Sequence, residues 1–320
     1  MVEVSIENLP QKTYGASLAL PAKASAALHA VFQTLAYADI FDYPLTASEV
    51  YRFLPLRRVS RQEVVRILQD ETYFTQLDGY FTVRGREQIV EIRKRREEVA
   101  ARMWRKARRY GRIIASLPFV RMVAVTGSLA MNNTDEGRDV DYMIVTAPGR
   151  LWTCRALSLL VARFAKLEGV SLCPNYLVTT HVLEFNERSL YVAHELSQMI
   201  PLSGMDVYHE MLRRNEWMAD YLPNALREPE TPEGGEQVKK YSVLQKILEI
   251  LFQLPFTNRF EKWEMTRKIK RLTHEQSASL ESYFSADVCK GHIDRHGENI
   301  VTALAARVAD SPSPLGSGLG

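Results

Sequence analysis

The stretch VAVTGSLAMNNTDEGRDVDYMIVT (residues 123–146) holds two apolar runs separated by small and polar residues. Each run has the length and composition of a buried β-strand. The first run ends in a Gly-Ser pair, and the second begins with Asp139 and Asp141, one residue apart. Side chains alternate along a strand, so we expect both carboxylates on the same face. Two adjacent carboxylates repel each other, and a divalent cation is the usual compensation.

The Gly-Ser pair, Gly127 and Ser128, predicts a tight turn at which the backbone can approach a ligand closely. The residues that follow it, LAM, can begin a helix whose free amide groups attract phosphate. Mg²⁺ prefers one or two carboxylates together with phosphate oxygens and water. The stretch therefore predicts a site for a nucleotide with Mg²⁺ or Mn²⁺, with the metal held at Asp139 and Asp141.

The Gly-Ser pair followed after ten residues by Asp-x-Asp makes residues 116 to about 200 resemble the polymerase-beta-like nucleotidyltransferase superfamily. The resemblance implies transfer of a nucleoside monophosphate from an NTP to a hydroxyl, with release of pyrophosphate. It also implies that Ser128 and the amides near it hold the triphosphate, while Asp139 and Asp141 hold Mg²⁺ as the catalytic residues. The acceptor hydroxyl, on a small molecule, RNA or protein, is not identified by the sequence.

One position departs from the superfamily pattern, in which a third carboxylate usually follows on the next strand. The matching run here, LCPNYLV, has Asn175 at that position. An Asn carbonyl oxygen can coordinate a metal, but the amide cannot act as a general base. Glu184, nine residues later, is the alternative third ligand if the strand bends back. The departure leaves open a second function: a nucleotide- or nucleic-acid-binding regulatory protein whose nucleotidyltransferase domain is weak or inactive.

Residues 24–84 show helix-start patterns and a hairpin. Capping boxes begin at Thr46 and Ser60, and Asp78-Gly79 joins two β-rich runs. Short helices followed by a hairpin predict a winged-helix-like domain. Such a domain can bind DNA through its second capped helix or act as a protein-contact module, and both alternatives remain open.

A long basic helix is predicted to connect this domain to the next, over residues 85–115. Residues 84–114 contain ten Arg and two Lys against four Glu, a local charge of +8. The helix can contact the phosphates of nucleic acid, because Lys and Arg displace condensed counterions. Alternatively, it is a solvated connecting helix whose Glu and Arg pair at helical spacing. An apolar stripe that includes Val99 and Trp104 favours the second interpretation.

Apolar strands then alternate with amphipathic helices, which predicts an α/β (α+β) fold with a mixed sheet of the nucleotidyltransferase type. The expected division of the chain is a flexible arm (1–23), the winged-helix-like domain (24–84), the basic connecting helix (85–115), the nucleotidyltransferase domain (116–225), a Pro/Gly-rich linker (226–239), a C-terminal helical region (240–308) and a disordered tail (309–320).

A second group of polar residues lies in CKGHIDRHG (289–297). If this segment is a helix, Cys289, His292 and His296 share one face. They then form part of a zinc site that lacks its fourth ligand, face solvent or a cleft, or contact the phosphate or the acceptor. The sequence does not choose among these three interpretations.

The composition of the chain places few limits on its function. The chain of 320 residues carries a formal net charge of +3, too small to indicate a partner. No apolar run reaches the roughly 18 residues that a membrane-spanning helix needs. Three cysteines, odd in number and far apart, give no disulfide framework. We therefore interpret the chain as a cytoplasmic protein without a membrane span.

Overall fold

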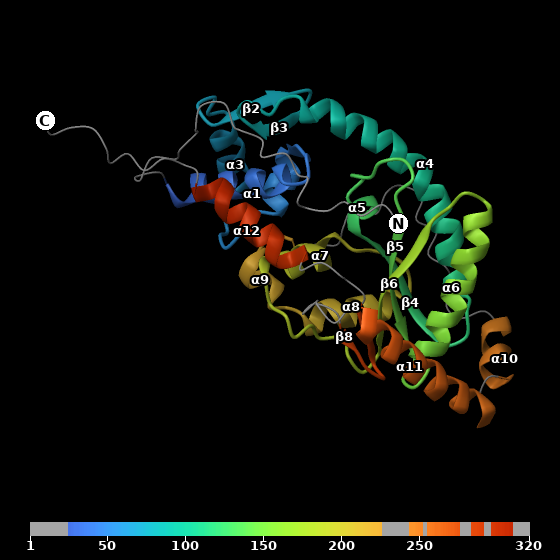
Figure 1. The fold of residues 1–320 in the computed structure, drawn as a ribbon. Coiled ribbons are helices and arrows are strands. Elements are labelled where there is room, and N and C mark those ends of the chain that lie inside the picture. The colour runs from blue at the N-terminus through green and yellow to red at the C-terminus, as the bar shows by residue number, and fades with distance from the viewer. Residues whose placement is uncertain (1–24, 226–242, 252–254, 276–282, 291–295, 310–320) are drawn as a thin grey trace, which may run out of the picture. The chain divides into compact units, whose positions relative to one another are not determined.

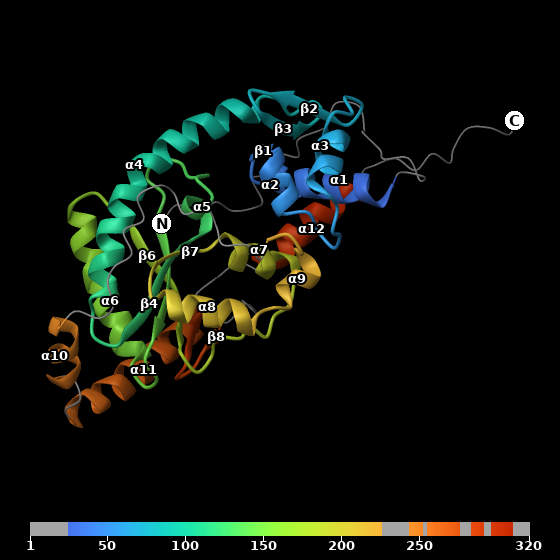
Figure 2. The same ribbon diagram turned by 180° about the vertical axis from the view of Figure 1, so that it is seen from behind.

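The structure is a computed structural model that describes residues 25–225, 243–251, 255–275, 283–290 and 296–309. It contains helices and two β-sheets, which confirms the predicted α+β class (Figures 1 and 2). The predicted arm (1–23), the predicted linker (226–239) and residues 310–320 lie outside the described residues. Within the described ranges, no helix is both long enough and apolar enough to cross a membrane.

The chain divides into two compact units. One combines Met1–Glu91 with Thr302–Gly320, and the other is Ile92–Val301. The elements of the first unit are, in chain order, α1 (Ala26–Asp39), β1 (Leu45–Thr46), α2 (Ala47–Arg52), α3 (Arg61–Leu68), β2 (Phe74–Leu77) and β3 (Tyr80–Val83). Its three strands form an antiparallel sheet in the order β1-β3-β2.

The local patterns of the first unit form as their sequence predicts. The Thr46 hydroxyl accepts from the Glu49 amide while the Glu49 carboxylate accepts from the Thr46 amide at 2.7 Å, which is a complete capping box. Ser60 caps α3 in the same way through its hydroxyl. Asp78 and Gly79 have φ values of 51° and 82°, the left-handed pair that a two-residue hairpin turn requires. The predicted hairpin is confirmed.

The second unit holds the larger sheet. Its elements are α4 (Ile89–Ala115, which begins in the first unit), β4 (Val120–Thr126), α5 (Gly127–Ala130), β5 (Val140–Thr146), α6 (Leu151–Leu167), β6 (Leu172–Thr179), α7 (Leu190–Gln198), β7 (Ile200–Ser203), α8 (Met205–Arg214), α9 (Met218–Tyr221), α10 (Val243–Leu251), α11 (Pro255–Glu275), β8 (Tyr283–Phe284), β9 (Val288–Lys290) and the beginning of α12 (His296–Ala309), up to Val301. The rest of α12 belongs to the first unit. The strand order is β7-β4-β5-β6-β9-β8.

The centre of this sheet sets the position of the candidate site. β4 runs antiparallel to β5, and β5 runs parallel to β6, with α6 as the crossover between them. In this register Thr126 lies opposite Asp141, and Asp141 lies opposite Cys173. The register shifts after Tyr142, which leaves Asn175 as an extra, bulged residue in β6.

Helices cover the two faces of the sheet differently. α4 and α6 lie on one face, while α7 and α8 lie on the other (Figures 1 and 2). Tyr142 points toward α4, and its hydroxyl donates to the Ala107 carbonyl at 2.6 Å. Val140 and Tyr142 are fully buried on this side. The predicted alternation of β5 therefore holds, and its Asp-bearing face is the one that α7 covers.

The C-terminal region is not entirely helical. Within the predicted helical region 240–308, β8 and β9 add two strands to the sheet, and β9 pairs with β6. Cys289 is buried in β9 opposite Leu177, so the predicted helix through Cys289 is wrong. A three-residue Val-Cys-Lys run becomes a strand because the free edge of β6 supplies its hydrogen bonds. His292 lies outside the described residues, and His296 is the first residue of α12.

Two carboxylates attach α10 and α11 to the core. Glu261, buried on α11, accepts from the amides of Trp152 and Thr153 at 2.9 and 2.7 Å, at the first turn of α6. Glu249 on α10 accepts from the Phe119 amide at 2.7 Å. These carboxylates satisfy amides that have no partner within their own helix or strand.

Candidate functional site

Four of the five residues predicted to bind the metal and the nucleotide lie at one end of the β4–β5 pair, and the fifth, Asn175, lies on β6. β4 ends at Thr126, and Gly127 and Ser128 begin the single turn α5 directly after it. Asp139 is exposed immediately before β5, and Asp141 is half-buried within it. Because Thr126 and Asp141 are cross-strand partners, the Gly-Ser pair and the Asp-x-Asp motif meet in space.

The contact between the two halves of the motif is close. Gly127 has a φ of +65°, a left-handed conformation that favours glycine. A Cβ atom at this position would lie 2.7 Å from Oδ2 of Asp141, closer than van der Waals contact allows. The absence of a side chain at Gly127 therefore lets the Asp141 carboxylate lie against the turn. The Ser128 hydroxyl makes no hydrogen bond to any other described residue and is free for a ligand.

The electrostatics at Asp141 oppose its negative charge. Burial, and then the neighbouring charge of Asp139, raises the pKa of Asp141 to about 7. A hydrogen bond with the Cys173 thiol and the charge of Arg138 act in the opposite direction. A cation bound between the two carboxylates would favour their ionised forms. The pair therefore has the electrostatic character of a cation site.

The adjacent strand does not supply a third carboxylate. Directly opposite Asp141 on β6 stands Cys173, and the next candidate, Asn175, is the bulged residue. Burial, and then the charge of Asp141, raises the pKa of the Cys173 thiol to about 12, so it remains protonated. Glu184 lies in the loop after β6 and pairs with Arg188 at 3.0 Å. Neither predicted alternative forms an acid triad within β5 and β6.

Glu195 was not predicted as a site residue. It lies on α7, half-buried, and burial followed by the charge of Asp141 raises its pKa to about 7. Lys290 on β9 acts in the opposite direction. The sequence does carry a signal: Glu195 interrupts an apolar helix between the buried residues His194 and Leu196. An acid in a buried helix face indicates a polar site, but not which strand it approaches.

A cavity of about 570 Å³ lies on the α7 side of the sheet. Thr126 and Met143 form part of its wall, so it lies on the Asp141 face of β4 and β5. Its acidic lining residues are Glu184, Glu187, Glu195 and Asp287, with Lys290 as the basic one, and these residues define the acid cavity. Tyr176 and Phe185 add an edge-to-face aromatic pair with ring centroids 5.5 Å apart. A volume of this size suits a small molecule.

The donor set fits a metal that is bound together with a phosphate ligand. Asp139 and Asp141 provide two carboxylates, which is the usual protein share of an Mg²⁺ site when substrate phosphates complete the coordination. Among the described residues, no group of three or more His, Cys, Asp or Glu side chains is arranged to hold a metal ion. Over the part of the chain that is described, the arrangement therefore does not resemble a closed structural metal site.

Comparison with known proteins does not assign the chain to a family. No family model matches it. No curated protein and no solved structure matches it either. The geometry of the site alone therefore carries the functional proposal.

Proposed function

We propose that the Ile92–Val301 unit is an Mg²⁺-dependent nucleotidyltransferase that moves a nucleoside monophosphate from an NTP to a hydroxyl. One observation carries the proposal: the Asp141 carboxylate lies against the Gly127 turn, 2.7 Å from where a Cβ would be. Phosphate contacts and metal ligands are thus adjacent, as a magnesium nucleotide requires. The mixed sheet, with β4, β5 and β6 in this order, supports a nucleotidyltransferase-type fold.

The residues of the chain have separate roles in this proposal. The Ser128 hydroxyl and the backbone at Gly127 bind the triphosphate, and Asp139 and Asp141 bind Mg²⁺. Because α5 is a single turn, individual amide groups and not a helix dipole provide the attraction. Mg²⁺, when bound, supplies neutralisation of phosphate charge and a lower pKa for the acceptor hydroxyl. When Mg²⁺ is bound, the two carboxylates would hold it beside the triphosphate.

The acceptor occupies the acid cavity. Its wall reaches Thr126 at the end of β4, next to the Gly-Ser turn, so a hydroxyl bound there lies near the triphosphate. Glu195 lines the same cavity and interacts electrostatically with Asp141. We assign Glu195 the task of accepting the hydroxyl proton, which Asn175 cannot perform. The acidic lining disfavours a polyanionic acceptor in this cavity.

A second candidate function is nucleotide binding without turnover. The specific observation in its favour is that β6 offers no carboxylate next to Asp141: Cys173 stands opposite it, and Asn175 holds the predicted position of the third acid. For the first unit, the order α1, β1, α2, α3, β2, β3 supports a winged-helix-like fold. We propose no nucleic-acid contact for this unit, because α3 presents Glu63 as well as Arg66 and the two pair at 3.9 Å.

Two measurements test the proposal. The purified chain is incubated with labelled NTPs, Mg²⁺ and a cell extract, and transfer of label to an acceptor is expected. Separately, Mn²⁺ with ATP should raise thermal stability, by about 2.7 kcal/mol at a hundredfold excess over Kd. Asp139→Asn with Asp141→Asn should abolish the metal-dependent gain, because the metal ligands are lost while the apo fold is retained.

The matched control is Glu136→Gln, which removes an acid from the same loop but on the α4 side, where it pairs with Arg102 at 2.7 Å. This variant should keep the full gain. An unchanged gain in the double Asp variant would contradict nucleotide binding at this site. A gain that is lost in the double variant, together with no label transfer by the wild type, would establish the binding function and reject the enzyme.

A further inference from the structure

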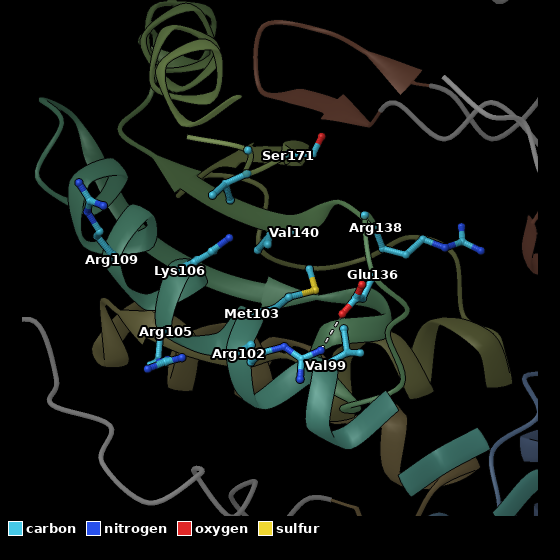
Figure 3. A pocket seen from close by; sticks show the side chains of 13 residues that line it. Val99, Arg102, Met103, Arg105, Lys106, Arg109, Glu136, Arg138, Val140 and Ser171 are labelled. Carbon is cyan, nitrogen blue, oxygen red and sulfur yellow. Dashed lines mark hydrogen bonds and ion pairs between the residues drawn. The ribbon is translucent and has the colours of Figure 1, made fainter. Parts of the chain in front are cut away.

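A second cavity lies on the opposite side of β5, beneath α4. Its volume is about 660 Å³, and its walls come from α4, from the loop before β5 and from the loop before β6 (Figure 3). Five cationic side chains line it and define the basic cleft: Arg102, Arg105, Lys106, Arg109 and Arg138. Figure 3 shows Met103 and Lys106 projecting from α4 toward Val140. Glu136 is the one acid in the lining.

Two of the five cations are neutralised by neighbouring acids. Arg102 pairs with Glu136 at 2.7 Å, and Arg109 forms a two-pronged pair with Glu168 at 2.8 and 3.3 Å. The side chains of the other three, Arg105, Lys106 and Arg138, make no hydrogen bond or ion pair with any described residue, although the charge of Arg138 acts on Asp135 and Asp141 and that of Lys106 acts on Glu168. The basic cleft therefore keeps a local excess of positive charge.

The N-terminal part of α4 has its positive charge matched by acids. Arg93 pairs with Glu97 at 2.7 Å, and Arg95 and Arg96 both pair with Asp135. Like charges held together repel each other unless an anion lies between them. The side chains of Arg105 and Lys106 in the cleft, and of Arg112 outside it, have no acidic partner among the described residues.

The floor of the basic cleft is apolar. Val99, Met103, Val140 and Val170 provide it, all of them buried or half-buried. A bare inorganic anion would contact the rim cations and leave this floor unused. A ligand with a phosphate and a flat, weakly polar body would use both, and its body would contact the apolar floor.

We propose that the basic cleft binds a nucleoside phosphate, with the phosphate at Lys106 and Arg105 and the base over the apolar floor. This site is separate from the proposed nucleotidyltransferase site, because Val140 and Asp141 point to opposite faces of β5. The ligand is either a free mononucleotide or the 5′-phosphorylated end of a strand, which share the same chemistry. The acid cavity excludes both by charge.

Equilibrium binding of AMP to the full chain in EDTA tests the proposal, with adenosine as the probe that lacks phosphate. AMP should bind at least about tenfold more tightly than adenosine, because charge-assisted contacts to phosphate are strong. Lys106→Glu should weaken AMP binding by about fivefold or more through repulsion. Ser171→Glu, which places an acid on the opposite wall, should weaken it as well.

The matched control is Arg112→Glu, the same charge change at an exposed position of α4 outside the cleft, and it should change AMP affinity by less than about twofold. Asp139→Asn with Asp141→Asn should also leave AMP binding unchanged, which separates this site from the metal site. A 5′-phosphorylated octanucleotide that competes with AMP, and loses binding in Lys106→Glu, would identify a strand end as the source. Binding of neither probe, or equal binding to wild type and Lys106→Glu, would overturn the proposal.

Discussion

The acid cavity and the basic cleft lie on opposite sides of the same strand, β5, and handle charge in opposite ways. On the side of the acid cavity, burial and then the charge of a neighbouring carboxylate raise the pKa values of Asp141 and Glu195 to about 7. In the basic cleft, the cations are exposed, and two of them are paired with acids of nearby loops. Water screens the exposed charges of the cleft, and also those of Glu184 and Glu187 at the cavity, but it screens the charges of Asp141 and Glu195 much less.

The difference follows from the alternation of side chains along β5. Val140 and Tyr142 are fully buried on the α4 side, while Asp141 and Met143 belong to the side that α7 covers. A single strand thus contributes Val140 to the apolar floor of the cleft and Met143 to the wall of the acid cavity, with the Asp141 carboxylate on the same face as Met143. The sheet separates the two regions except for the charge of Arg138, which lines the cleft and acts on Asp141. A change that leaves Arg138 in place should therefore keep ligand binding in the other region intact, and three predictions test that independence.

The largest expected effect concerns two glycines, one in each region. Gly127→Ala should destabilise the chain by about 2–3 kcal/mol, because its φ is +65° and the new Cβ meets Asp141 at 2.7 Å. Gly137→Ala, at the basic cleft, has a φ of +78° but no atom within 4 Å of the added Cβ. This substitution should lower the free energy of unfolding by only about 1 kcal/mol, because only the backbone conformation is strained.

Urea unfolding of the two variants measures the difference between their free energies of unfolding. This difference isolates the effect of the close approach between residue 127 and the Asp141 carboxylate. Gly127→Ala should also lose the Mn²⁺-dependent gain in thermal stability, while Gly137→Ala should keep it. Equal destabilisation by the two substitutions would mean that the Gly127 turn and the Asp141 carboxylate do not touch in solution.

A smaller effect on stability is expected from a change of pH, and it comes from the side of the sheet that α7 covers. Burial lowers the pKa of His194 to about 3, so its imidazole stays neutral in the folded chain. The unfolded chain binds that proton below a pH of about 6.5, so stability is lost as the pH falls through this value. Between pH 7 and pH 5 the loss from His194 should be about 2 kcal/mol.

His194→Gln should remove that part of the pH dependence, measured as the difference in unfolding free energy between variant and wild type at each pH. Lys106→Glu in the basic cleft is the comparison, and its difference from wild type should not follow the same curve, since His194 is unchanged in that variant. A wild type and a His194→Gln variant with parallel pH profiles would show that His194 is accessible to water.

The smallest effect concerns the bulged residue. Asn175→Asp should tighten Mn²⁺ binding by about tenfold, because it adds a carboxylate to a cavity that already holds Glu195. Glu184→Gln should change the affinity by less than about twofold, since the Glu184 carboxylate pairs with Arg188. Mn²⁺ titration in the absence of nucleotide measures both, and AMP binding to the basic cleft should not change in either variant. If Glu184→Gln alone lost Mn²⁺ affinity, then Glu184, and not residue 175, would be the residue next to the metal.

Local chemistry made part of the fold predictable. The capping box at Thr46 and the turn at Asp78-Gly79 depend on residues within four positions of each other, and the structure has both. The positions of Gly127 and Asp141 at strand ends were also predictable, because each follows or begins an apolar run. Their contact required only that two consecutive strands pair, which is the commonest arrangement.

Features that depend on residues far apart in the sequence were not predictable. Glu195 interacts with Asp141 only because α7 folds back over the sheet, and Cys173 stands opposite Asp141 only because β6 aligns in parallel with β5. The bulge at Asn175 shifts that register by one residue, which no pattern in LCPNYLV indicates. The sequence led us to expect Glu–Arg pairs along α4, whereas most partners of its cations, such as Asp135 and Glu168, come from other segments.

The pairing of β6 with β9 has a consequence for synthesis of the chain. The Thr179 hydroxyl, on the last residue of β6, donates to the Asp287 carboxylate just before β9, at a sequence separation of 108. At translation rates of about 5–20 residues per second, the ribosome needs on the order of 5–20 s to span that separation. Until then, one edge of β6 has open hydrogen-bonding groups that a foreign strand can join. During that interval the nascent sheet is open to edge-to-edge association with another chain.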